Sequence, residues 1–179
     1  MLRFAIMVFT LLAWTSGVAF SNQKETESKM SIEHMNALIE AVGDGISKPT
    51  KGQWRFRIER IPVFIVTDTR ADRMRILIGI AKTTDISAAL FERLMQANFD
   101  TTLDARYAVA RGVVWAAFLH PFKSLSDTEF LSGLGQTVNL ARTFGKTYSS
   151  GGLTYKGGDS SGIIERELIE KLLEKGLAI

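Results

Sequence analysis

The sequence QWRFRIERIPVFIVTDTRADRMRILIGI, residues 53–80, decides the fold of this chain. Apolar side chains take every second position over residues 54–58 and again over residues 74–80, and a third apolar run at residues 63–66 lies between them. An alternation with a period of two is typical of a β-strand that buries one face. Because only short links join the three runs, they predict three sequential strands in an antiparallel meander.

Helices are predicted on both sides of this meander. Ser31 can cap the first helix, and Gly43 ends a run of apolar residues that recur at helical spacing. Thr84 or Asp85 can cap the second helix, and Asn98 is expected to close it. One face of each helix is apolar, so both are expected to pack on the domain core.

Two more strands and a third helix complete the predicted domain. Residues 105–109 alternate, whereas residues 113–119 are nearly all apolar, as expected of a central strand. The segment Ser126–Glu129 fits a capping box and opens a helix that should end near Gly145. The order is therefore helix, three strands, helix, two strands, helix, which is an α+β fold over residues 31–145.

The composition changes after this domain. Residues 146–162 are rich in glycine and serine and poor in apolar residues, so they are predicted to form a flexible linker. Residues 163–176 follow as an amphipathic helix with Ile164, Leu168 and Leu172 on one stripe. This tethered helix must bury its stripe on its own domain or on a partner.

The first twenty-one residues, MLRFAIMVFTLLAWTSGVAFS, have the three-part form of a secretory signal peptide. Arg3 gives a positive start, an apolar run follows, and cleavage is expected between Ser21 and Asn22. A retained anchor is one alternative, but Thr and Ser interrupt the run before the roughly 18 apolar residues of a membrane span. An internal start at Met30, giving a cytoplasmic chain, is another. Cleavage predicts a periplasmic or secreted protein without a stable membrane span.

The bulk composition limits the chemistry of the mature chain. Residues 22–30 form a polar leader, and the remaining length suits one domain with appendages. The absence of cysteine removes disulfides, thiolate nucleophiles and thiolate metal sites. Loss of Arg3 with the signal changes the formal charge from +3 to +2, and acidic and basic residues are interspersed. Nucleic-acid binding is therefore not expected.

No motif in the sequence predicts catalysis, a metal site or a bound cofactor. Residues 158–162 match G-x-S-x-G, but a nucleophile elbow needs a preceding strand and a later histidine, and both His34 and His120 come before it. Two histidines without cysteine do not make the usual zinc constellations. The turn with Asp68 and Asp72 lacks the spacing of a calcium loop. We therefore assign no catalytic, metal or cofactor residues.

Two sets of residues are candidates for binding a partner. The first is a stripe of arginines that the strand alternation places on one sheet face, which either binds acidic partners or serves as a solvated face. The second is the stripe of the final helix. The candidates are Arg55, Arg57, Arg73 and Arg75, with Ile164, Leu168 and Leu172.

The stretch LFERLMQANFDTTLDARYAVARGVVWAAFLHPF, residues 90–122, resembles the type III secretion chaperone-like superfamily, including its bacterial sensory transduction regulator group. The resemblance lies in a leucine-rich helix end at Leu90–Asn98, the strand pair ending at Val113–Leu119, and the phrase Ile61-Pro62-Val63. It covers about residues 31–144. It implies a twisted antiparallel sheet with packed helices, a homodimer, and protein binding without catalysis. Classical members are acidic and cytoplasmic, whereas this chain is basic and carries an export signal.

Two classes of function remain open. The first is an exported, non-enzymatic module that binds a protein or peptide through an apolar sheet or helix surface. The second is a small-molecule carrier or enzyme with a pocket between sheet and helices and with His120 or Asp104 at its mouth. A third alternative places the final helix on a membrane surface, but its mixed Glu and Lys face favours protein contact.

Overall fold

The computed structural model describes residues 29–151 and 160–179, with the backbone alone for residues 160–165. The helices are α1 (Ile32–Val42), α2 (Ala88–Asp100), α3 (Asp127–Thr143) and α4 (Ser160–Gly176). The strands are β1 (Asp44–Ser47), β2 (Gln53–Ile58), β3 (Ile61–Asp68), β4 (Arg73–Lys82), β5 (Arg106–Ala110) and β6 (Val113–His120). These elements confirm the predicted α+β class. The signal peptide and residues 22–28 of the leader lie outside the described residues.

All strand pairs in the sheet are antiparallel, in the order β1-β2-β3-β4-β6-β5. The prediction of three strands before α2 was wrong, because β1 adds a fourth. This strand has one apolar residue, Ile46, so no alternation marks it in the sequence. Its pairing with β2, which includes an irregularity between Asp44 and Ser47, is what makes it a strand.

The start and end of α2 also differ from the prediction. Thr84 and Asp85 lie in a 3-10 turn, and the N-cap of α2 is Ser87, whose hydroxyl accepts a hydrogen bond from the backbone N–H three residues on. Asn98 does not close the helix, which continues to Asp100. Its side chain accepts from the backbone N–H and donates to the carbonyl oxygen of Tyr107, so it ties α2 to β5.

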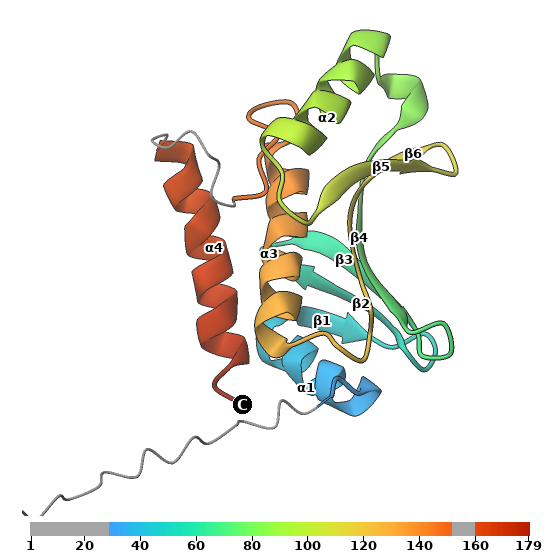
Figure 1. The fold of residues 1–179 in the computed structure, drawn as a ribbon, viewed down its shortest axis with the longest axis vertical. Coiled ribbons are helices and arrows are strands. Elements are labelled where there is room, and N and C mark those ends of the chain that lie inside the picture. The colour runs from blue at the N-terminus through green and yellow to red at the C-terminus, as the bar shows by residue number, and fades with distance from the viewer. Residues whose placement is uncertain (1–28, 152–159) are drawn as a thin grey trace, which may run out of the picture.

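The core lies between one face of the sheet and the helices (Figure 1). Along β2, buried and exposed residues alternate strictly, as the sequence predicts. The buried sheet residues meet the apolar faces of α1 and α3 in a single cluster. The capping box at Ser126 and Glu129 is confirmed: each side chain accepts from the other residue's backbone N–H. It fixes the start of α3, the central helix of the fold.

α4 lies beside α3 (Figure 1). Leu168 and Leu172 are only 4% and 3% exposed and belong to the core cluster. Gly135 of α3 permits the close approach, because a Cβ there would lie 2.7 Å from Cγ1 of Ile169. In the described structure, the final helix therefore buries its stripe on its own domain.

The start of the predicted linker, residues 146–151, packs against the domain, so the flexible-linker prediction was wrong for this part. Ser150 is buried; its hydroxyl accepts from the backbone N–H of Leu103, and its carbonyl accepts from the amide of Asn139. Tyr148 lies in an aromatic cluster with Tyr107 and accepts at its carbonyl from the Thr101 hydroxyl. Side-chain partners thus order a glycine- and serine-rich segment. Residues 152–159 lie outside the described part.

Met30, the last residue of the predicted leader, is buried in the core. The polar composition of the leader therefore applies only up to Lys29, which is exposed. Across residues 29–151 and 160–179, no helix has both the length and the apolar composition needed to cross a membrane.

Candidate functional site

One face of the sheet is not covered by any helix within the described ranges (Figure 1). All four arginines predicted for partner binding lie on it and are exposed, while their strand neighbours on the other face are buried. We call this surface the open face. It consists of Arg55, Arg57, Arg73 and Arg75 with the outward side chains of β3 and Leu119 of β6.

The strand register fixes how the arginines surround β3. The cross-strand pairs are Arg57 with Pro62, Arg55 with Phe64, Arg75 with Val66, and Arg73 with Asp68. The arginines of β2 therefore flank the first half of β3, and those of β4 flank the second half. The guanidinium of Arg55 lies over the Phe64 ring at 5.5 Å, a cation–π geometry. The outward side chains Pro62, Phe64 and Val66 form an apolar ridge along β3, with arginines on both sides of it.

The four arginines of the open face outnumber the carboxylates that lie opposite them in the described part of the chain. None of the ion pairs found there involves these four arginines. Two carboxylates lie opposite these arginines in the register: Asp44 is opposite Arg57, and Asp68 is opposite Arg73. Asp68 accepts hydrogen bonds from two backbone N–H groups of its own turn. The face can therefore offer its guanidinium groups to an external carboxylate.

The apolar part of the open face was missed in the sequence. Leu119 is 55% exposed, and Val66 and Phe64 are partly exposed beside the arginines. The signal was present, because residues 61–66 are continuously apolar and such a run places apolar side chains on both faces of a strand. Without the sheet order, the sequence did not show that one face would remain uncovered.

The second predicted set, the apolar stripe of the final helix, is not exposed where the structure describes its side chains. Leu168 and Leu172 belong to α4 and are buried where this helix packs on the domain. Partner binding through them would require α4 to detach. The side chain of Ile164 lies outside the described part of the structure, as do Gly158 and Asp159 of the G-x-S-x-G match. Ser160 is the first residue of α4.

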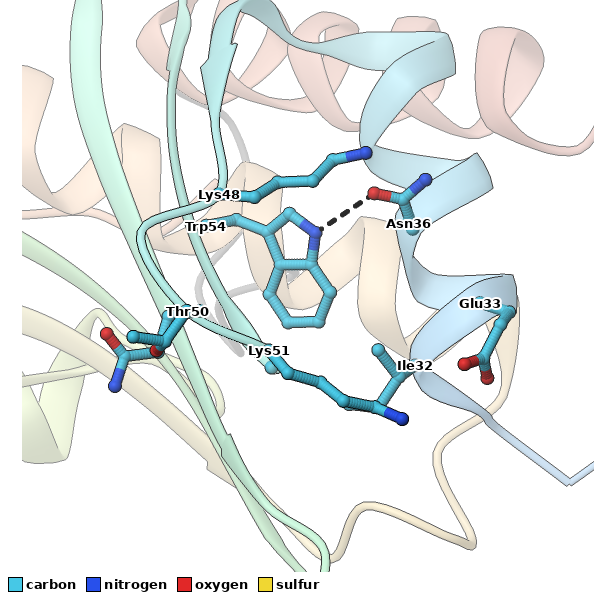
Figure 2. A pocket seen from close by; sticks show the side chains of 9 residues that line it. Ile32, Glu33, Asn36, Lys48, Thr50, Lys51 and Trp54 are labelled. Atoms are coloured by element: carbon cyan, nitrogen blue, oxygen red, sulfur yellow. Dashed lines mark hydrogen bonds between the residues drawn. The ribbon is translucent and has the colours of Figure 1, made fainter.

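A cavity of about 410 Å³ lies between α1 and the loop at residues 48–52 (Figure 2). The indole of Trp54 donates to Oδ1 of Asn36 at 3.2 Å, and the side chain is only 2% exposed. Nζ of Lys48 lies 2.8 Å from Glu40, and this hydrogen bond, with a second from Asn36, lowers the pKa of that carboxyl. Three polar side chains of this cavity, Asn36, Lys48 and Trp54, therefore already have hydrogen-bond partners.

A second cavity of about 530 Å³ lies where the starts of α1 and α3 meet. Nε2 of His34 lies 2.7 Å from the Asp127 carboxylate and links the two helices. Lys29 and Lys123 also line the cavity. Over the described ranges, no three His, Cys, Asp or Glu side chains come together as a metal site would require.

A third cavity of about 470 Å³ brings together the two residues predicted at the mouth of a pocket, Asp104 and His120. It lies between the start of β5, the end of β6 and the first half of α3. Its other lining residues are Arg106, Phe118, Leu119, Thr128, Glu129 and Ser132. Nε2 of His120 lies 3.8 Å from the Glu129 carboxylate, and Nδ1 lies 2.8 Å from the carbonyl of Pro121. We call this cavity the notch.

Gln136 of α3 holds the wall of the notch. Its Oε1 accepts from the backbone N–H groups of Asp104 and Ala105 at 3.0 and 3.2 Å. Its Nε2 donates to the Asp104 carboxylate and to the Ser132 hydroxyl. A side chain that is 2% exposed thus positions two residues of the cavity wall. The sequence showed only a glutamine in an amphipathic helix.

Comparison with known proteins adds no family to this description. No protein-family model matches the chain, and no curated protein matches it either.

Proposed function

We propose that the protein is a non-enzymatic module that binds an acidic, partly apolar protein or peptide segment on the open face. The observation that carries this proposal is the set of four exposed arginines beside the apolar ridge of β3, without ion-pair partners in the described part of the chain. Carboxylates would pair with the guanidinium groups, and apolar side chains would cover Phe64 and Val66.

The proposal includes export and a relationship to the type III secretion chaperone-like superfamily. The form of the first twenty-one residues supports export, and a mature chain recovered from the periplasm should begin at Asn22. The helix flanked by meander and strand pair, and the residues of the Leu90–Phe122 stretch, support the relationship. A periplasmic protein would use such a fold for a partner other than a cytoplasmic secretion substrate.

The binding test uses a double variant of the open face. Arg55→Gln with Arg75→Gln should weaken binding of a synthetic peptide of alternating Glu and Leu by about tenfold, since each exposed charge pair contributes about 0.2–1 kcal/mol. The affinity of the unchanged protein should also fall with salt. Titration calorimetry measures both.

The control for this experiment makes the same change in net charge elsewhere. Arg111 and Lys171 are exposed and lie away from the open face. Arg111→Gln with Lys171→Gln should leave the affinity for the peptide unchanged. Equal losses in the two double variants would show that net charge alone attracts the peptide and would refute a site on the open face.

A homodimer is also part of the proposal, and α2 offers the surface for it. Phe99 is 91% exposed and Met95 52% exposed, one helical turn apart, and the exposed Leu103 follows three residues after the last residue of the helix. A soluble chain rarely leaves such a stripe uncovered. Two copies of one apolar stripe can cover each other about a twofold axis.

Replacing Phe99 by glutamate should convert the dimer to a monomer. The change places a charge in the proposed contact, where it would lack a partner. Sedimentation equilibrium of both proteins gives the masses, and Leu177→Glu, at an exposed position near the C-terminus, is the control. A Phe99→Glu protein that sediments as the unchanged protein does would exclude this surface from the dimer.

A further inference from the structure

The notch exists because β5 is shorter than the strand beside it. β5 begins at Arg106, opposite Ala117, whereas β6 continues through three more residues to His120. Those three residues, Phe118, Leu119 and His120, pair with β4 on one side. On the other side they have no strand partner within residues 29–151 or 160–179. A strand edge of this kind presents unpaired N–H and C=O groups.

The chain before β5 does not pair with this edge of β6, because Gln136 binds its backbone. Asp104 and Ala105 donate their backbone N–H groups to the Gln136 side chain of α3 and not to β6. The chain therefore leaves the sheet plane, and the space it would have taken along β6 becomes the notch. The opening is formed by buried and partly buried hydrogen bonds of Gln136, so it is a fixed feature of the fold.

Two side chains of opposite charge, Arg106 and Glu129, mark the ends of the notch. The Asp104 carboxylate also lines it and accepts a hydrogen bond from Nε2 of Gln136. Arg106 stands where β5 begins, with Nη1 held by the hydroxyl of Thr102 at 2.6 Å and by the carbonyl of Ala105 at 3.2 Å. Glu129 of α3 stands at the other end, 3.8 Å from His120. Hydrogen bonds from the backbone and hydroxyl of Ser126 lower the pKa of Glu129, so it is ionised at neutral pH.

We propose that the notch binds a short free peptide, of about three residues, as an added strand antiparallel to β6. Such a peptide would continue the line of β5, so its C-terminal carboxylate would meet Arg106 and its N-terminal ammonium would meet Glu129. Three residues at about 3.4 Å each span the unpaired length of β6. The volume of about 470 Å³ is that of a small-molecule site. Main-chain bonds to β6 would supply affinity without a sequence requirement.

The test uses the tripeptide Ala-Leu-Ala as the probe, in its free form, with an amidated C-terminus and with an acetylated N-terminus. Titration calorimetry with the full mature chain should show binding of the free form and a loss of about tenfold for each blocked form. Arg106→Gln should lower affinity for the free form by a similar factor. Arg106→Gln should cause no further loss for the amidated form, because that peptide has no C-terminal carboxylate to pair with Arg106.

Glu129→Gln is the matching variant for the other end. Glutamine keeps the acceptor of the capping box, so α3 should remain capped while the charge is lost. This variant should bind the free and acetylated peptides equally. Arg111→Gln is the control and should bind as the unchanged protein does. Free and blocked tripeptides that bind equally, or a single amino acid that binds as tightly as the tripeptide, would overturn the proposal.

Peptide binding in the notch and peptide binding on the open face can be tested independently. The Arg55→Gln, Arg75→Gln double variant should still bind the tripeptide, and Glu129→Gln should still bind the alternating Glu and Leu peptide. Loss of tripeptide binding in the open-face variant would place the peptide on the sheet and not in the notch.

Discussion

Replacing Leu172 by alanine is expected to lower the free energy of unfolding by about 2–5 kcal/mol, the usual range for truncating a buried leucine. Leu172 belongs to the core cluster, although the sequence left open whether its helix packs on its own domain or on a partner. The melting temperature should fall by about 4–20 °C, since 1 kcal/mol corresponds to about 2–4 °C for a chain of this length.

The control for this variant is Leu177→Ala, just beyond the same helix. Leu177 is exposed, so its truncation should change the free energy of unfolding by less than about 0.5 kcal/mol. A Leu172→Ala protein that melts at the temperature of the control would mean that α4 is not docked on its own domain. The buried stripe would then be available to a partner, as the sequence allows.

Replacing Gln136 by leucine is expected to lower the free energy of unfolding by about 2–6 kcal/mol. The substitution has a similar volume but leaves the backbone N–H groups of Asp104 and Ala105 without their acceptor, and each unsatisfied buried group costs about 1–3 kcal/mol. Denaturant unfolding followed by circular dichroism measures the loss. Affinity for the tripeptide should fall as well, because Asp104 and Ser132 lose their shared donor.

Gln96→Leu is the matched control, because Gln96 is an exposed glutamine on α2. The same chemical change there should alter stability by less than about 0.5 kcal/mol. If Gln136→Leu is as stable as this control, the hydrogen bonds of Gln136 do not hold the start of β5 away from β6. The explanation given for the notch would then be wrong.

Local patterns in the sequence predicted most of the fold. The alternation in β2 and β4, and the reciprocal caps of Ser126 and Glu129, depend on neighbouring residues and were read correctly. β1 was missed because its pairing with β2, and not its own composition, makes it a strand. The cap of α2 was misplaced because the 3-10 turn before it shifts the helix start to Ser87.

The candidate sites were predicted only in part, because each depends on residues distant in the chain. The four arginines follow from strand alternation, but the apolar ridge between them requires the register of β2, β3 and β4. Asp104 and His120 were predicted as alternatives at the mouth of one pocket, and the structure places both in the lining of the notch. Gln136, thirty-two positions after Asp104, holds Asp104 in the wall of the notch, and no local pattern connects these two residues.

The sequence by itself determined the α+β class, the positions of most elements and the outward direction of the arginines, because these depend on periodicity and on caps within a few residues. The tertiary structure alone decided that one sheet face stays open, that α4 docks beside α3, and that β5 stops short of the end of β6. These features arise from contacts between residues far apart in the chain, where burial and hydrogen-bond satisfaction override local composition.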